Sequence, residues 1–154
     1  MFKEMRRQDR ELTRSETDEI LLNGVYGVLS INGEDDYAYG VPLSYVYTGS
    51  QIYFHCALEG HKLNCIRNSN KVTFCVVAKA NTLPDKFSME YASAIVFGEV
   101  GEVHDQEKFA ALTAFVEKYS SSYMEKGKAY ADSAHHKTVV LKIDSKHITG
   151  KARK

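Results

Sequence analysis

Residues 51–63 have the sequence QIYFHCALEGHKL and contain the change of element on which the fold prediction rests. Gln51–Ala57 is predicted to be a β-strand, because its side chains alternate in character and successive strand side chains point to opposite faces. Gly60 opens a turn, and His61–Asn68 is predicted to be a short helix because its apolar residues recur at the i, i+3 spacing. A strand, a glycine turn and a helix that starts with two basic residues therefore form the centre of the prediction.

The other strands are predicted from alternation and from bounding turn residues. The expected strands are Val25–Ile31, Tyr37–Tyr47, Gln51–Ala57, Val72–Val77, Met89–Val103, Thr138–Ile143 and His147–Gly150. Pro42 cannot donate a ladder hydrogen bond, so its strand should have an edge or a bulge there, and Gly98 suggests a bulge or a close backbone approach. A loop is expected over Asn81–Ser88 and a turn at Asp144-Ser145.

Two further helices are expected outside this central stretch. Thr13 and Glu16 have the spacing of a capping box at the start of the first, with Ser15 as a rival N-cap. Asp105 is the expected N-cap of a helix that carries apolar residues on one face. Ser120–His136 is polar and rich in small residues, and no element is assigned to it.

The predicted order is helix, three strands, helix, two strands, helix, two strands. Since strands dominate and follow one another through short turns, we expect a mainly β fold, an antiparallel barrel of six to seven strands with helices packed outside. A parallel α/β sheet is disfavoured by the same order. The length of 154 residues fits one domain, and 44% hydrophobic residues are enough for a core.

Charge and cysteine content exclude several classes of protein. The formal net charge is zero, which argues against nonspecific nucleic-acid binding, because that depends on an excess of positive charge. The three cysteines contain no C-x-x-C pair, so a disulfide scaffold or a structural zinc site is not expected. The charged start of the chain has no apolar segment typical of a secretory signal, and no run is long enough for a membrane span. A cytoplasmic protein is therefore expected.

The helix that starts at His61 breaks a local rule. Cations near a helix N-terminus oppose the helix dipole, so His61 and Lys62 stand at an unfavourable end. A bound anion would resolve the conflict, because the free N–H groups of a helix N-terminus favour a phosphate and Lys62 would add a charge. The alternative is that both side chains simply point into water.

Few other residues are candidates for chemistry. His55, in a strand among aromatic residues, is either structural or, beside a phosphate or flavin, a candidate proton donor. Cys56 is more typical of a small core residue than of a nucleophile. Ser93, the hydroxyl of an apolar strand, could bond a buried ligand or neighbouring backbone. His135-His136 has no further ligand at metal-binding spacing, so no metal site is predicted.

Five blocks of the sequence, in the same order and over nearly the whole chain, carry a resemblance to a known family: Arg6–Arg10, Val41–Tyr45, Tyr53–Ala57 with Gly60–Lys62, Tyr91–Gly98 and Ile148–Lys151. Taken together, they resemble the FMN-binding split-barrel family related to pyridoxamine 5′-phosphate oxidase, in its nitroimidazole-resistance (nitroreductase-like) branch. This resemblance implies one split-barrel domain over residues 1–154 that binds FMN, with FAD as a possible replacement.

The resemblance also implies a homodimer with two FMN molecules at the subunit interface. Lys62 would hold the phosphate with help from His61, and His55 would be the catalytic residue near the reactive face. Ser93 and Lys151 would approach the cofactor from the central strand and from the tail. The implied cofactor-binding residues are Pro42, Leu43, Ser44, His55, Cys56, Ala57, His61, Lys62, Ser93 and Lys151.

Three functions are consistent with these residues. The first is an FMN-dependent oxidoreductase that reduces nitroimidazoles or other small nitroaromatic compounds, with the redox chemistry carried by the flavin. The second is a non-catalytic flavin, haem or deazaflavin binding protein on the same barrel. The third is a dimer that only mediates interactions. Vitamin B6 oxidation is not expected, because the fuller set of basic residues of the phosphate-oxidase branch is missing.

Overall fold

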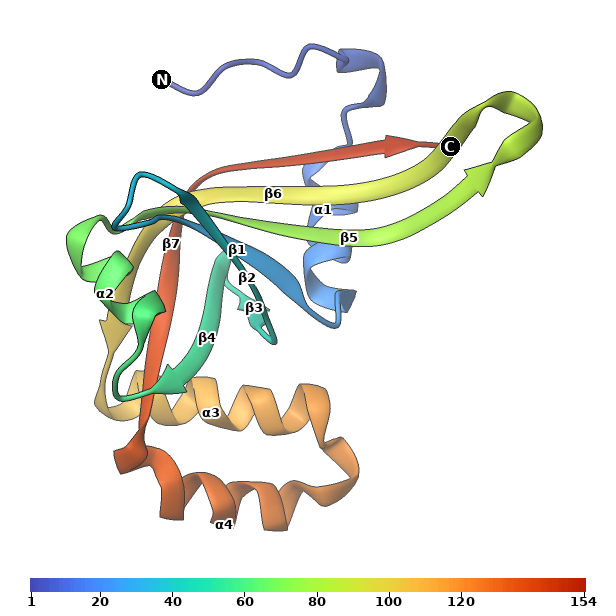
Figure 1. Cartoon of the computed structure of the whole chain (residues 1–154). Coiled ribbons are helices and arrows are strands. Elements are labelled where there is room, and N and C mark those ends of the chain that lie inside the picture. Colours follow the sequence, from blue (N-terminus) through green and yellow to red (C-terminus); the bar gives the residue numbers. More distant parts are fainter.

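The computed structural model describes residues 1–154 and contains one seven-stranded antiparallel sheet with four α-helices (Figure 1). The strands are β1 Gly27–Asn32, β2 Ala38–Leu43, β3 Val46–Thr48, β4 Gln51–Ala57, β5 Lys71–Leu83, β6 Ser88–Val103 and β7 Thr138–Arg153. The helices are α1 Arg14–Asn23, α2 His61–Asn68, α3 Asp105–Tyr119 and α4 Met124–Ala134. The spatial order β2-β1-β5-β6-β7-β4-β3 confirms the predicted mainly β, antiparallel architecture with helices outside the sheet.

Several local predictions are confirmed. Thr13 caps α1, and Glu16 completes the capping box by accepting from the Thr13 backbone N–H at 2.9 Å. Strand β4 and helix α2 have the predicted bounds. Pro42 lies in β2, an edge strand of the sheet, where its missing N–H costs no ladder bond.

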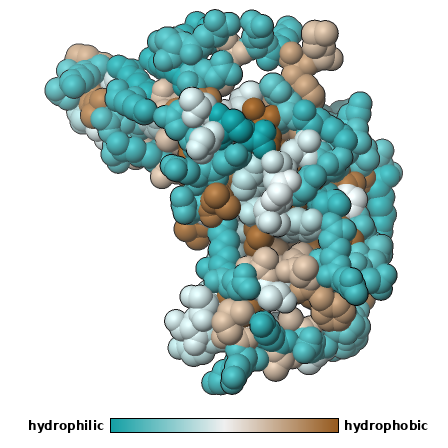
Figure 2. All heavy atoms as spheres, turned by 180° about the vertical axis from the view of Figure 1, so that it is seen from behind, coloured by the Kyte–Doolittle hydropathy of each residue, from teal (hydrophilic) through white to brown (hydrophobic).

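The predicted loop over Asn81–Ser88 is wrong, because β5 continues to Leu83 and β6 begins at Ser88. Only Pro84–Lys86 and the left-handed Phe87 (φ 47°) form the turn. The resulting β5–β6 hairpin projects from the body of the protein (Figure 1), and hydrophilic residues cover most of it in Figure 2. Its polar composition resembles that of a loop because both of its faces meet solvent, while pairing with β6 satisfies the backbone.

The predicted turn at Asp144-Ser145 is also wrong, since β7 is one continuous strand that bends alongside β6 (Figure 1). The bend coincides with a register shift between Phe97 and Gly98, which confirms the bulge predicted at Gly98. A Cβ atom at Gly98 would lie 2.5 Å from the carbonyl oxygen of Asp144, so a side chain there would push the two strands apart.

Three other segments differ from the prediction. The strand expected over Tyr37–Tyr47 is divided into β2 and β3, because the Tyr45 N–H donates to the Tyr119 hydroxyl (3.0 Å) instead of a neighbouring strand. The N-cap of α3 is His104, whose carbonyl accepts from the Lys108 N–H (3.2 Å), and Asp105 is already inside the helix. The unassigned Ser120–His136 contains α4.

The two faces of the sheet are covered differently. The inner face packs with α1 and α2 around a core of buried residues that includes Leu21, Phe54 and Phe74. On the outward face, α3 covers β3 and the first half of β7, where Leu112 packs with Val140, and α4 packs against α3 (Figure 1). None of the helices is both long and apolar enough to cross a membrane.

We call the remaining part of the outward face the open face. It is formed by β1, β5, β6 and the second half of β7, whose outward side chains lie in cross-strand rows. One row is Val28, Cys75, Ile95 and Thr149, and the next is Ser30, Thr73, Phe97 and His147.

Candidate functional site

The N-terminus of α2 is free to bind an anion. Its N-cap, Gly60, has no side chain to accept a helical N–H, and the first turn contains no acidic residue. The first intrahelical bond runs from the Asn64 N–H to the Gly60 carbonyl (3.2 Å), so the three preceding N–H groups have no intrahelical acceptor. Together with Lys62, these donors form the positive, phosphate-compatible helix end that the sequence predicted.

The His61 side chain is 50% exposed but also contacts its neighbours. Its Nε2 atom lies 3.6 Å from the Cys65 sulfur, and its Nδ1 atom lies 4.0 Å from a carboxylate oxygen of Glu34. The ring also meets Tyr39 edge-on, with 4.8 Å between centroids. Because α2 and the β1–β2 hairpin both contact the His61 ring, this side chain is positioned by its neighbours, while the partly exposed Lys62 supplies the charge at this helix end.

His55 lies on the outward side of β4 against α3. Its ring meets Phe115 edge-on at 4.7 Å between centroids. His55 still has exposed surface, but the protein atoms packed around its ring partly desolvate it and lower its pKa, and the nearby positive charge of Lys62 lowers it further. The imidazole is therefore mainly neutral at pH 7. Cys56 points to the inner side, and burial raises the pKa of its thiol although Lys62 opposes that shift, so this cysteine is not a thiolate at neutral pH.

The segment Pro42–Ser44 approaches the same region. Pro42 and Ser44 are exposed, whereas Leu43 packs against the core. The next strand begins at Val46, which pairs with Tyr53 of β4, two residues before His55. We call the predicted site residues of this part of the chain the helix-end group: Pro42, Leu43, Ser44, His55, Cys56, Ala57, His61 and Lys62.

Ser93 and Lys151 lie elsewhere, directly opposite each other on β6 and β7. They line a hollow of about 450 Å³ on the open face, together with Ile95 and Thr149. We call Ser93 and Lys151 the open-face group. Their side chains point outward, so they are accessible to a ligand or to a second copy of the chain.

One chain does not bring the two groups together. His55 pairs with Val140 near the start of β7, whereas Ser93 pairs with Lys151 near its end. The interval from residue 140 to residue 151 corresponds to about 36 Å along a strand. The bend in β7 also turns its two halves in different directions (Figure 1).

Comparison with known proteins identifies the family. The model of the pyridoxamine 5′-phosphate oxidase family matches residues 13–152. The chain belongs to this family. The match covers nearly the whole chain and confirms the resemblance recognised in the sequence. No curated protein matches the chain.

Solved structures share the fold of this oxidase-family member. A candidate 5-nitroimidazole antibiotic resistance protein from Bacteroides thetaiotaomicron has a TM-score of 0.80 at 23% identity, covering 92% of this chain and 86% of that one. An FAD-binding protein from Mesorhizobium loti gives 0.66 at 20% identity, covering 94% and 98%. An FAD and haem binding protein from Mycobacterium smegmatis gives 0.76 at 16% identity, covering 94% and 74%. At these identities the matches show the fold alone.

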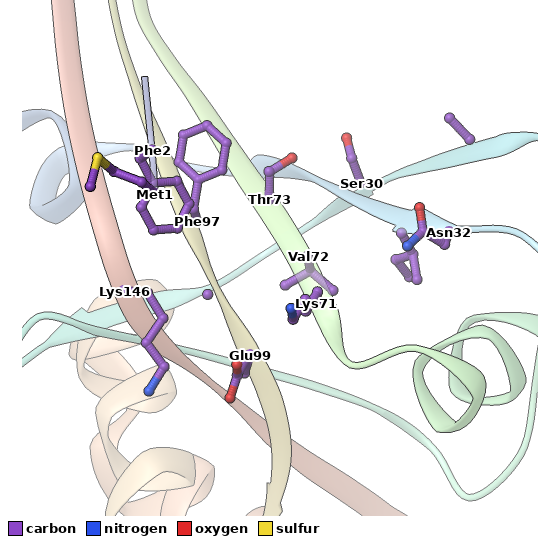
Figure 3. Close-up of a pocket in the computed structure, with 13 residues that line it drawn as sticks. Met1, Phe2, Ser30, Asn32, Lys71, Val72, Thr73, Phe97, Glu99 and Lys146 are labelled. Atoms are coloured by element: carbon purple, nitrogen blue, oxygen red, sulfur yellow. The ribbon is translucent and has the colours of Figure 1, made fainter. Parts of the chain in front are cut away.

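Sequence reasoning missed the residues that surround a second hollow on the open face of this oxidase-family member. Phe2, from the N-terminal arm, stacks on His147 at 4.7 Å and lies 5.2 Å from the Phe97 ring. Beside this aromatic group is a hollow of about 620 Å³, and Figure 3 shows Met1, Phe2 and Phe97 on one side of it. The alternation of β6 could have identified Phe97, which lies on the same side of the strand as Ser93, but no local pattern places Phe2 beside it.

Proposed function

We propose that this protein is an FMN-dependent oxidoreductase that works as a homodimer, with the cofactor at the subunit interface. Membership of the pyridoxamine 5′-phosphate oxidase family supports this proposal. The observation that carries it is the uncapped N-terminus of α2, where Lys62 lies close enough to lower the pKa of His55. A phosphate held there would be next to a neutral imidazole.

The donor set of the helix-end group fits the phosphate end of a flavin nucleotide. Lys62 and the free N–H groups of α2 would hold the phosphate, and Pro42–Ser44 would line the ribityl chain and the ring. The flavin supplies the redox chemistry when it is bound. The contribution of the protein is then to orient it and to place charges and donors around it.

A second copy of the chain would complete this site. The open face exposes apolar side chains, including Val77 (60%) and Ile95 (37%), which a partner could cover. Ser93 of β6 and Lys151 of β7 lie too far from the helix-end group of their own chain to join it. They would therefore contact the cofactor that is bound mainly by the partner. This arrangement requires the dimer for binding.

His55 would deliver or relay a proton to the substrate. Its lowered pKa leaves little imidazolium at pH 7, so a rate that depends on His55 as an acid should rise as the pH falls toward that pKa. Small nitroaromatic compounds, including nitroimidazoles, are the proposed substrates, since the structural neighbours include a candidate nitroimidazole-resistance protein. Reduced holoprotein that fails to pass electrons to any nitroimidazole would contradict this assignment.

The first experiment is the visible spectrum of protein purified without added cofactor, followed by mass spectrometry of the released ligand. We expect a flavin spectrum and released FMN. Lys62→Gln should weaken FMN binding by about 10- to 100-fold, because a charge-assisted hydrogen bond contributes about 1.5–3 kcal/mol. Lys128→Gln, at an exposed position in α4, is the matched control and should bind like the wild type. A colourless protein that takes up neither FMN nor FAD would overturn the proposal.

A non-catalytic flavin, haem or deazaflavin binding protein is the second candidate. The structural similarity to a protein that binds FAD and haem supports it, as does the neutral state of His55, because a neutral imidazole is the form that ligates haem iron. The same spectrum separates the two functions. Haem absorption that is lost in His55→Gln would favour this candidate over the oxidoreductase.

A further inference from the structure

A group of cationic residues surrounds one tyrosine at the margin of the open face. Tyr91 of β6 lies directly opposite Arg153 of β7, one row beyond the Ser93–Lys151 pair. Arg10, from the N-terminal arm, donates to the Tyr91 hydroxyl at 3.4 Å. The Lys151 ammonium lies 5.7 Å from the centre of the Tyr91 ring. We call Arg10, Tyr91, Lys151 and Arg153 the Tyr91 cluster.

The three positive charges of this cluster have no carboxylate partner. Asp9 is paired with Arg7 (2.5 Å) and Glu16 with Lys154 (3.4 Å). The guanidinium of Arg153 donates to the Ser88 hydroxyl, which carries no charge. Like charges repel one another, so the approach of these three cations without a carboxylate weakens the local pairing unless an anion joins them.

These cations change the pKa of the Tyr91 hydroxyl. The hydrogen bond from Arg10 lowers the pKa of the Tyr91 hydroxyl, and the charge of Lys151 adds to that effect. Arg7 is also close enough for Tyr91 to influence its pKa. The phenol is therefore held in a local positive potential that favours any nearby anion.

The cluster borders space for a ligand. A hollow of about 400 Å³ is lined by four cations and three carboxylates. Asp9 and Glu16 are neutralised by Arg7 and Lys154, and Glu11 has no ion pair, so Arg10 and Arg153 are the cations of the lining that no carboxylate pairs with. Lys151 belongs to both the cluster and the hollow of about 450 Å³ that contains Ser93. An elongated ligand could therefore reach from Ser93 to Arg10 and Arg153.

We propose that the Tyr91 cluster binds the phosphate groups of a nucleotide, next to the flavin. The location beside the flavin rests on the proposed function, whereas the charge arrangement does not. Guanidinium groups match phosphate oxygens in pairs, and Arg10 and Arg153, which both lie next to Tyr91 and line the same hollow, can provide such contacts. The phosphates could be the adenylate-side phosphate of FAD, next to the flavin-side phosphate assigned to Lys62, or the diphosphate of a dinucleotide electron donor.

The test is titration calorimetry of the full-length protein with ADP and with inorganic pyrophosphate. Arg10→Gln and Arg153→Gln should each weaken ADP binding by about tenfold, because each removes one charge-assisted interaction. The matched control is Arg6→Gln, an exposed arginine on the same arm that makes no hydrogen bond or ion pair. It should leave the affinity within about twofold of the wild type. Wild-type protein that binds neither compound, or an equal loss in Arg6→Gln, would overturn the proposal.

Two comparisons identify the source of the phosphates. If FAD is the ligand, it should bind more tightly than FMN, and Arg10→Gln should abolish the difference. If a dinucleotide donor is the ligand, FMN and FAD should bind equally, and 2′,5′-ADP should compete with ADP. Either result supports the cluster as a phosphate site. FMN binding to the wild type and to Lys62→Gln tests the flavin site independently. If the protein binds FMN but not ADP, only the Tyr91 cluster proposal is contradicted. If it binds ADP but not FMN, only the flavin site is contradicted.

Discussion

The outward face of the sheet has two regions that differ in what covers them. Over β4 and the first half of β7, helix α3 packs closely enough that Val140 and Leu112 are buried. Over β5 and β6 the same alternation of side chains leaves Val77 and Ile95 exposed. Both regions have apolar side chains on the outward face, so the difference is that α3 covers one of them and no helix of the chain covers the other.

The predicted site residues are divided between the covered and the open region. His55 belongs to the covered region, where Phe115 contacts it and burial shifts its pKa, whereas Ser93 and Lys151 belong to the open region. A site that needs all three residues needs a second chain. The following experiments test whether one region is stabilised within the chain and the other between chains.

The largest expected effect is in the covered region. Phe115→Ala should lower the free energy of unfolding by about 3–5 kcal/mol, because the ring is 8% exposed and contacts both His55 and Tyr119. Urea unfolding measures the change. Phe115→Leu is the control and should lose less than about 1.5 kcal/mol. A loss in Phe115→Ala as small as in the control would mean that α3 is not packed on this face.

In the open region, Ile95→Arg should act on assembly rather than on folding. Ile95 is 37% exposed in the single chain, so its replacement should leave the monomer folded. It should weaken the proposed dimer by at least about tenfold, since a buried unpaired charge disfavours an interface. Sedimentation velocity over a range of concentrations measures the dissociation constant. Tyr130→Arg, at a 74% exposed position in α4, is the control, and equal behaviour of the two variants would contradict the dimer face.

A smaller effect is expected from His55 on the pH dependence of stability. The folded pKa of His55 lies below its ordinary value of 6.5, so the unfolded chain binds the proton more readily. Stability should therefore fall as the pH drops below about 6.5, and His55→Gln should reduce that fall. Urea unfolding at pH 7.5 and pH 5 compares the two proteins. If the free energy of unfolding changes equally between the two pH values in both proteins, the covered region does not lower the pKa of the His55 imidazole.

The smallest effect at pH 7 is expected at Lys118, where burial lowers the pKa to about 8. Its ammonium donates to the Tyr45 carbonyl (2.9 Å), which also accepts from Tyr119 (3.0 Å). Lys118→Met should therefore change stability by less than about 1 kcal/mol at pH 7, because the carbonyl keeps one partner. Between pH 8 and 10.5 the wild type should gain stability relative to the variant, since only the unfolded lysine still holds its proton. Thermal unfolding across that range measures the difference, and a constant difference would contradict the shifted pKa.

Much of the fold could be predicted from local patterns. The capping box of Thr13 and Glu16, the alternation of Gln51–Ala57 and the apolar spacing in His61–Asn68 each depend on residues a few positions apart, and all three were found where predicted. The β5–β6 hairpin and the continuous β7 were missed. The hairpin end was missed because both of its faces meet solvent, so its residues are polar like those of a loop. The continuous β7 was missed because its backbone hydrogen bonds go to strands far away in the sequence.

The candidate site shows the same division. The sequence by itself determined the family, the positive start of α2 and the presence of His55 beside it, because these follow from residue types at short spacing. Only the tertiary structure decided that Ser93 and Lys151 are adjacent but far from His55, and that Arg10 meets Tyr91. Such distances depend on strand register and on the bend in β7, which arise from pairing between distant segments and have no local signal.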